Sequence, residues 1–479
     1  MRLNDAALVV DMDGTLIKSD SLHETLLRLV VEHPIPSIGL PGLVTRGKPE
    51  FKRLVADRKI LAPDNLPYNE AVIEMVRRAR AEGRTTALVS AADHRQVEVV
   101  AAHLGLFDLA VGTGAMAAGA GNIAGSGKAA LLRQTFGEKG FDYIGDSRAD
   151  LPVWAAARDA YVVGPSTGLH KAAEEHGLRL IAVDKPGPRW RPALRAMRPH
   201  QWSKNFLVLL PALAAHDLSA LGPALIAMLI FCFVASSVYL LNDLIDLPSD
   251  RAHPRKRLRP FASGALKIRD GLMLAAGLMV VSLLLSLALL PPLFLAVLAL
   301  YFVTTFAYSI WLKRKVLIDV VTLAGLYTLR IIAGAAATGI ILSPWLLGFS
   351  MFIFFSLAAI KRQAELTDFG KNGDEKPAGR GYMASDLPVV RGIAISAGQA
   401  AVLVFALYVN STAIEDLYKR PELMWLICPI LLYWLGRMEL MTHRGYMSDD
   451  PIVFAARDRV SQVCVLTMAL VVVAAVFGG

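Results

Sequence analysis

Cysteine is scarce in this sequence, which contains only three such residues among 479. Cys232, Cys428 and Cys464 all lie in apolar runs and lack the spacing of metal ligands. The sequence therefore predicts neither a disulfide framework nor a cysteine-based metal site. Small buried hydrophobic side chains are the expected role of these residues.

A signal peptide is also lacking. The first apolar run, Leu8-Val9-Val10, is too short for one and leads directly into acidic residues. We therefore expect the N-terminal domain to stay in the cytoplasm.

Nucleic acid is not needed to explain the net charge of +9. Basic residues gather in loops between long apolar runs, near 251–269, 313–315, 361–391 and 437–459. Cytoplasmic loops of membrane proteins carry such an excess of Lys and Arg. The pattern predicts a multi-pass membrane protein without a nucleic-acid partner.

The apolar residues, which make up 54% of the chain, are distributed unevenly. Residues 1–185 alternate buried-strand and helix patterns, which predicts an α/β domain with a parallel sheet. A linker or interfacial segment rich in Pro and charge follows at 186–198. Residues 199–479 contain about nine apolar runs long enough for a bilayer, which predicts an all-α polytopic membrane domain. The expected spans lie near 202–216, 219–243, 270–290, 291–311, 316–340, 344–362, 389–411, 423–437 and 459–478.

Two carboxylates follow the first expected strand, at residues 6–10. Asp11 and Asp13 stand at the strand end where open α/β sheets bind ligands. One carboxylate can attack phosphorus while the other shuttles a proton. Because a phosphate dianion repels a carboxylate, the site also needs a metal ion and a nearby cation.

Suitable partners follow in order along the chain. Ser90 ends the second expected strand and can donate a hydrogen bond to phosphate, and Lys128 supplies a cation. Asp146 and Asp150 end the third strand and supply further oxygen ligands. Over residues 6–165, these motifs resemble the haloacid dehalogenase superfamily of phosphohydrolases.

This resemblance implies a Rossmann-like domain with a small helical cap at residues 19–67. It implies Asp11 as the nucleophile, Asp13 as the general acid and base, and Ser90 with Lys128 as the phosphoryl-binding pair. One Mg²⁺ would be bound by Asp11, Asp13, Asp146 and Asp150. The alternative is a domain that serves only as a non-catalytic scaffold.

A second acidic motif ends the second long apolar run. Asn242, Asp243 and Asp246 fall on one face of the expected helix, and Asp250 follows. Carboxylates this close repel one another unless a divalent cation neutralises them. Mg²⁺ bridging carboxylates and a diphosphate would satisfy this requirement.

A basic loop follows the acidic motif and contains Arg251, Lys256, Arg257 and Arg259. Arg contacts phosphate through two nitrogens and Lys acts as a point charge, so the loop predicts a phosphate clamp. Basic residues kept only for membrane topology are the alternative. Over residues 190–478, the acidic motif with this loop resembles the UbiA prenyltransferase superfamily.

Most members of that superfamily transfer a prenyl group from its diphosphate to an aromatic ring. They carry a second Asp-rich motif after the sixth span, where this chain reads Ile360-Lys361-Arg362-Gln363-Ala364-Glu365-Leu366. This departure disfavours aromatic prenylation, which remains the alternative function. Three segments resemble the decaprenyl-phosphate phosphoribosyltransferase branch instead, namely residues 198–205, 361–366 and 457–462.

The branch implies phosphoribosyl pyrophosphate (PRPP) as the donor and a polyprenyl phosphate as the acceptor. It also implies arabinan synthesis for the cell wall at a bacterial inner membrane. Asp243 and Asp246 would be catalytic and, with Asp250, would hold one or two Mg²⁺ ions. The candidate substrate-binding residues are Gln201, Lys204, Asn242, Arg251, Lys256, Arg257, Arg259, Lys361, Arg362, Glu365, Asp458 and Arg459.

Further expectations concern single residues and the product. Pro248 disfavours helix at the preceding residue, so we expect Asp250 to lie in a loop. We expect Arg330, inside a span, to pair with Asp319. The fused phosphatase would remove the 5-phosphate of the lipid-linked product. A homo-oligomer is compatible with the sequence.

Overall fold

The computed structural model describes residues 6–32, 48–114, 123–164, 166–184, 190–371, 381–415, 417–447 and 450–478. The chain divides into two compact units. Unit 1 comprises Met1–Met197 and Tyr239–Leu274, and unit 2 comprises Arg198–Val238 and Ala275–Gly479. The segment that contains the second acidic motif therefore groups with the N-terminal residues.

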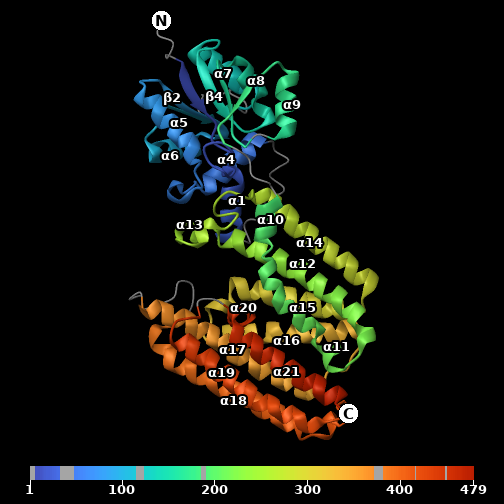
Figure 1. The fold of residues 1–479 in the computed structure, drawn as a ribbon. Helices are drawn as coiled ribbons and strands as arrows, with labels where there is room; N and C mark the ends of the chain where they lie inside the picture. The colour runs from blue at the N-terminus through green and yellow to red at the C-terminus, as the bar shows by residue number, and fades with distance from the viewer. Residues whose placement is uncertain are drawn as a thin grey trace. The chain divides into compact units, whose positions relative to one another are not determined.

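Unit 1 is built on a six-stranded sheet with the order β3-β2-β1-β4-β5-β6, in which every neighbouring pair is parallel (Figure 1). This confirms the predicted α/β class. The strands are β1 (Ala7–Val10), β2 (Thr86–Asp93), β3 (Leu109–Thr113), β4 (Phe141–Gly145), β5 (Ala160–Val162) and β6 (Leu180–Ala182).

Helices cover both faces of this sheet, because its central strands are apolar on both sides. Leu8 and Val10 pack with residues of α5 and α6, while Val9 and Phe141 pack with residues of α7, α8 and α9. A parallel sheet is stable when both faces are buried in this way. The helices of residues 6–197 are α1 (Ser21–Glu32), α4 (Lys48–Arg58), α5 (Glu70–Ala81), α6 (His94–Leu104), α7 (Ser126–Phe136), α8 (Leu151–Ala156), α9 (Thr167–Glu175) and α10 (Trp190–Ala196), with the 3-10 turns η2 (Pro63–Asn65) and η3 (Arg148–Asp150).

The expected cap and linker are described in part. Helices α1 and α4 occupy the expected cap, while residues 33–47 lie outside the described residues. Within the expected linker, 186–198, residues 190–196 form α10, and residues 186–189 lie outside the described residues.

The remaining part of unit 1 follows the second acidic motif. It contains the end of α12 (Leu221–Ile245), then α13 (Leu247–Ala252), η6 (Lys256–Leu258) and the start of α14 (Ile268–Leu289). The expectation that Asp250 lies in a loop is wrong, because it lies in α13 and its amide donates to the carbonyl of Asp246 at 2.9 Å. Pro248 occupies the first turn of α13, where its missing N–H needs no partner.

All the secondary structure found among the described residues of unit 2 is helical. Its longer helices lie alongside one another in Figure 1, and they bury two main apolar clusters. Besides the parts of α12 and α14, it contains η4 (Pro199–Leu209), α11 (Leu210–Ala214), η5 (Leu218–Ala220), α15 (Pro292–Ile310), η7 (Leu312–Arg314), α16 (Ile318–Thr338), α17 (Pro344–Lys371), η8 (Ala384–Asp386), α18 (Leu387–Val409), η9 (Thr412–Ile414), η10 (Pro421–Leu426), α19 (Ile427–His443), α20 (Pro451–Arg457) and α21 (Arg459–Phe477).

Eight helical segments among the described residues are long and apolar enough to cross a membrane. In the most apolar windows of α14 and α21, only 17% of the residues are buried within the protein, so their apolar surfaces are directed outward, as lipid contact requires. The segments are Leu218–Ile245, Ile268–Leu289, Pro292–Ile310, Ile318–Thr338, Pro344–Asp368, Ala384–Val409, Pro421–His443 and Arg459–Phe477.

The expected first span, residues 202–216, is not among these eight. It folds as η4 followed by the five-residue α11, and neither has the length of a span. Pro211 lies in the first turn of α11 and cannot donate a backbone hydrogen bond to continue the preceding helix. The segment therefore carries its polar residues Lys204 and Asn205 into the interior of unit 2.

Candidate active sites

The first candidate site lies at the carboxyl ends of β1 and β4. Asp11 follows β1, while Asp146 and Asp150 follow β4, which is paired with β1. Ligand oxygens of the three carboxylates lie within 4.8 Å of one another. They form the one such group of three that is found in the described part of the chain.

Lys128, in the first turn of α7, supplies the opposite charge. Its Nζ donates to Asp11 Oδ1 and to the hydroxyl of Tyr143, each at 2.9 Å, and lies 3.8 Å from Asp150 Oδ1. The lysine side chain is only 3% exposed. Burial raises the pKa of Asp11 to about 6, against the opposing charge of Lys128.

Asp13 is not one of the three grouped carboxylates, although its charge interacts with that of Asp11. Its two oxygens accept hydrogen bonds from the amide and the hydroxyl of Ser21, at 2.8 and 2.9 Å. Burial raises the pKa of Asp13 to about 8, and the nearby charge of Asp20 adds to this increase. A protonated Asp13 could act as a general acid. Its side chain does not belong to the group of three carboxylates that could hold a metal ion.

Two further features shape this site. Ser90 is buried within β2, where its hydroxyl oxygen accepts from the amide of Ala92 at 3.2 Å. Gly14 has φ +77°, and a Cβ there would lie 2.3 Å from Oδ2 of Asp146. Only glycine allows the turn after β1 to approach the Asp146 carboxylate this closely.

The carboxylate cluster fits a magnesium ion. Three buried or half-buried carboxylates with one lysine leave a net negative charge, and oxygen is the ligand that Mg²⁺ prefers. Asp11, Asp146 and Asp150 are therefore the residues that could hold it.

The second candidate site is the acidic motif at the end of α12. Arg259 Nη1 lies 3.1 Å from Asp243 Oδ1 and 2.7 Å from Asp250 Oδ2, so one guanidinium group bridges two carboxylates. Asp243 and Asp250 are 3% and 2% exposed. A buried carboxylate pair needs such a cation to offset its mutual repulsion.

Asn242 and Asp246 complete this motif. The amide of Asp246 donates to the carbonyl of Asn242, so the two residues lie one helical turn apart. Among the described residues, the buried Oδ1 of Asn242 has no hydrogen-bond partner. An orphaned oxygen of this kind could serve as one ligand of a divalent cation. Among the described residues, however, Asp243, Asp246 and Asp250 do not form a group with the spacing found at Asp11, Asp146 and Asp150, and Arg259 pairs with Asp243 and Asp250.

The other basic residues of the following loop differ from one another. Arg251 is buried, and its guanidinium group contacts both oxygens of Glu24 in α1, at 3.0 and 2.6 Å. Lys256 and Arg257 are exposed in η6. Arg251 is therefore committed to an ion pair within unit 1, while the other two side chains are accessible.

The third candidate site lies inside unit 2 and centres on Asp450, at the start of α20. Its Oδ2 lies 2.6 Å from Lys204 Nζ and 3.3 Å from Lys361 Nζ. Burial alone would raise the pKa of Asp450, but the charges of Lys361 and Lys204 hold it well below its usual range. Two lysines share one carboxylate, so the group keeps a positive charge.

Aromatic and amide groups surround these lysines. The hydroxyl of Tyr327 donates to Asp450, and Lys204 Nζ lies 5.8 Å from the centre of the Tyr327 ring. Arg330 donates to Asn205 Oδ1 and to the hydroxyl of Tyr301, each at 3.0 Å. The site thus adds a third cation, and a buried cluster of excess positive charge suits a phosphate.

The expected pairing of Arg330 with Asp319 is wrong. Asp319 pairs instead with Arg362, and both side chains are 0% exposed. Tyr382 donates to Asp319 at 2.7 Å, and Arg362 also contacts Glu365. This pairing links α16 to α17 and makes Arg362 part of the protein interior.

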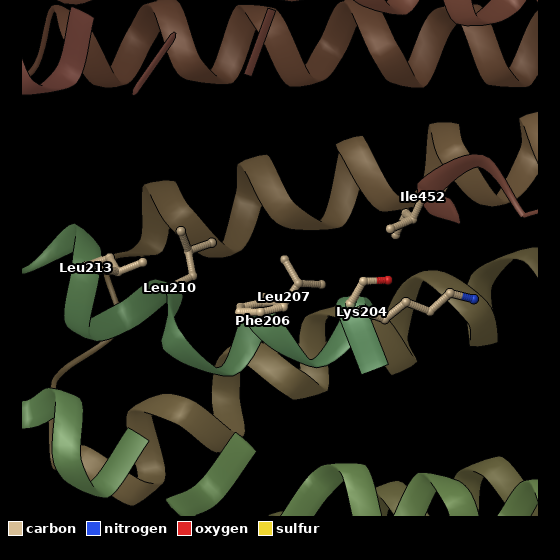
Figure 2. A pocket seen from close by; sticks show the side chains of 7 residues that line it. Lys204, Phe206, Leu207, Leu210, Leu213 and Ile452 are labelled. Carbon is tan, nitrogen blue, oxygen red and sulfur yellow. The ribbon is translucent and has the colours of Figure 1, made fainter. Parts of the chain in front are cut away.

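A groove adjoins Lys204 on the same segment. Figure 2 shows Lys204 towards one end of it and Leu213 at the other, with Ile452 of α20 opposite. The groove has a volume of about 180 Å³ and is lined by Ser203, Lys204, Phe206, Leu207, Leu210, Leu213 and Ile452. Phe206 and Leu213 are 62% and 53% exposed, which suits an apolar ligand.

The remaining candidates lie elsewhere in unit 2. Gln201 is half-buried in η4. Asp458 accepts two hydrogen bonds from Arg437 and caps α21 by accepting from Ser461. Arg459 is exposed at the start of that helix. Asp458 therefore stabilises a helix end, and the structure does not bring it to the lysine cluster.

The sequence reasoning missed Asp450 and Glu24. The sequence Asp450-Pro451 is a helix-start signal, and Asp450 does cap α20 by accepting from Ile452. Its other oxygen, Oδ2, pairs with Lys204 and Lys361. These lysines are far away in the sequence, so no local sequence pattern could predict the pairing. For Glu24, the sequence predicted only that it lies in the helical cap. It did not predict that this carboxylate is buried.

Two family models match the chain. The UbiA prenyltransferase family matches residues 206–457, and the haloacid dehalogenase-like hydrolases match residues 8–154. The first match covers the second candidate site and most of the third, except Lys204 and Asn205, and the second match covers the first candidate site.

Similar proteins span one or both regions. The uncharacterized protein y4nM of Sinorhizobium fredii is 37% identical over 95% of this chain and 88% of its own length. The nodulation protein NoeC of Azorhizobium caulinodans is 38% identical over 57% of this chain and 90% of its own length. The decaprenyl-phosphate phosphoribosyltransferase of Mycolicibacterium smegmatis is 31% identical over 59% of this chain and 92% of its own length.

Proposed function

The chain belongs to the UbiA prenyltransferase family and carries a haloacid dehalogenase-like domain at its N-terminus, and from this premise we propose that it is a bifunctional membrane enzyme. Its transferase moves the 5-phosphoribosyl group of PRPP to a polyprenyl phosphate and releases diphosphate. Its N-terminal domain is a phosphatase. The domains are residues 1–185 and 199–479, joined by 186–198.

One observation carries the choice of donor. Where most of the superfamily has a second Asp-rich motif, this chain has Lys361 and Arg362, and Lys361 shares Asp450 with Lys204. A prenyl diphosphate has no anionic group beyond its diphosphate, whereas PRPP carries an additional 5-phosphate. The excess positive charge supports an additional phosphate, as does the similarity to a phosphoribosyltransferase.

The acceptor follows from the groove beside Lys204. A polyprenyl phosphate has an anionic head and a long apolar chain, which match Lys204 and the side chains of Phe206, Leu210 and Leu213. The phosphate oxygen of this acceptor is already anionic. It can attack C1 of the ribose as the C1–O bond to diphosphate breaks, so no general base is needed.

The acidic motif would hold the leaving group. Bound Mg²⁺ would neutralise charge on the departing diphosphate. Arg259 contacts Asp243 and Asp250. Its guanidinium group would therefore lie near a diphosphate bound at these carboxylates and could donate hydrogen bonds to the diphosphate oxygens. We propose one or two ions here and one at Asp11.

In the phosphatase, Asp11 attacks phosphorus and forms an aspartyl phosphate while Asp13 protonates the leaving alcohol oxygen. Water then attacks the phosphorus, Asp13 accepts its proton, and inorganic phosphate leaves. Lys128 and Ser90 would contact the phosphoryl oxygens. The substrate we propose is the 5-phosphate of the lipid-linked transferase product. The basic loops support a cytoplasmic N-terminal domain at a bacterial inner membrane.

The donor assignment is tested with purified protein in detergent. Labelled PRPP with a polyprenyl phosphate should yield a labelled lipid after extraction, whereas geranyl diphosphate with 4-hydroxybenzoate should yield no prenylated product. The opposite result would overturn the phosphoribosyl assignment in favour of aromatic prenylation. We also propose that the product serves arabinan synthesis for the cell wall.

A further inference from the structure

The loop between α13 and α14, residues 253–267, is anchored to the phosphatase-like fold. At its start, Arg251 of α13 pairs through two nitrogens with Glu24 of α1, and both side chains are at most 4% exposed. The Nε of Arg251 also donates to the carbonyl of Ala262 at 3.3 Å. Figure 1 shows α13 beside α1, so a segment of the transferase sequence packs on the cap of the phosphatase.

A second contact holds the loop against the Asp11 motif. Gly264 has φ +73°, and a Cβ there would lie 2.5 Å from Lys18 Cβ and 3.3 Å from Pro67 Cβ. Lys18 belongs to the turn that follows Asp11 and Asp13, and its amide donates to the carbonyl of Pro67. Only a residue without a side chain allows this approach, so the loop backbone lies directly on that turn.

The loop ends at the carboxylate cluster. Lys267 Nζ lies 3.5 Å from Asp146 Oδ2, and the lysine side chain is 62% exposed while that of Asp146 is 17% exposed. Lys128 is buried and contacts the other two carboxylates, Asp11 and Asp150. The cluster is therefore flanked by two lysines, one inside the fold and one at its rim.

The two lysines suit different parts of a substrate. Lys128 is fixed between buried groups and suits the phosphoryl group that is transferred. The ion pair of Lys267 with Asp146 is long, at 3.5 Å, and its lysine end is exposed to solvent, so the pair contributes little free energy. Exchanging its carboxylate partner for a substrate anion therefore costs little.

We propose that Lys267 is a substrate-binding residue of the phosphatase and contacts a second anionic group, on the leaving-group side of a phosphate monoester. The preferred substrate class is then a sugar phosphate that carries a further phosphate or phosphodiester. This inference rests on the proposed phosphatase activity and adds a residue from the transferase sequence to its site.

The test compares two esters with full-length protein and Mg²⁺. One is ribose 5-phosphate, and the other is the same ester with a methyl phosphodiester at C1. Since a phosphomonoesterase does not cleave the diester, each compound has one phosphate that can be hydrolysed. Lys267→Ala should raise KM for the diester-bearing compound roughly tenfold. Its kcat, and both constants for ribose 5-phosphate, should change less than about twofold.

Two variants serve as controls. Lys267→Arg keeps the charge and should retain the low KM, whereas Lys171→Ala removes an exposed lysine of α9 and should change neither ester. An equal rise in KM for both esters, or no rise, would overturn the role of Lys267. If the wild type hydrolyses neither ester in the presence of Mg²⁺, the phosphatase assignment itself fails.

Discussion

Asp450 and Lys204 lie 246 positions apart in the chain, yet Oδ2 of Asp450 lies 2.6 Å from Nζ of Lys204. The same oxygen lies 3.3 Å from Lys361. This carboxylate therefore sets the distance between a lysine assigned to the acceptor and a lysine assigned to the donor. Removing its charge should affect both stability and transfer.

We predict that Asp450→Asn destabilises the protein by about 3–5 kcal/mol, because two buried or half-buried lysines lose their shared counter-charge. Lys204→Met should relieve part of this cost. The double variant should then be at least about 1 kcal/mol more stable than the sum of the single effects predicts. Thermal unfolding in detergent measures all four proteins, and additive effects would mean that the two residues do not interact.

Asp243→Ala and Asp246→Ala should each lower phosphoribosyl transfer by about a hundredfold or more, because a carboxylate that holds the metal ion at the leaving group is lost. Membrane insertion should be unchanged. Asp270→Ala, which removes an exposed carboxylate at the start of α14, is the matched control. Near-normal transfer in either of the first two variants would exclude the acidic motif as the metal site.

Asp11→Asn should abolish phosphate release from the lipid product while leaving the transfer step within about twofold of wild type. Asparagine cannot form the acyl phosphate, because its amide is a poor nucleophile. Chromatography of the lipid extract should then show the 5-phosphorylated species accumulating. An identical product mixture in the wild type and the variant would show that the phosphatase acts on a substrate other than the lipid product.

Arg362→Met should lower the stability of the fold by about 3–5 kcal/mol, because it removes the buried cation that pairs with the buried Asp319. Arg362→Met with Asp319→Asn should restore much of the lost stability, since both charges are then removed. Yield of folded protein and its thermal midpoint report the outcome. A double variant that is no more stable than Arg362→Met alone would contradict this prediction.

Local patterns in the sequence determined much of this protein. The strand before Asp11 and the helix that ends at Asp243 are contiguous segments, so hydrophobic runs and nearby polar residues predict them directly. The two families, the parallel sheet and the membrane-spanning character are confirmed. The roles of the site residues remain predictions.

Only the tertiary structure decided which charges meet. Arg259 pairs with Asp243 and Asp250. Arg251 pairs with Glu24. Lys204 and Lys361 both pair with Asp450. The sequence analysis predicted Arg251, Arg259, Lys204 and Lys361 as phosphate ligands, because periodicity shows which face of an element a residue occupies but does not show its partner. A buried charge is costly unless an opposite charge lies beside it. The tertiary structure determines which opposite charge that is, and the partner can come from any part of the chain.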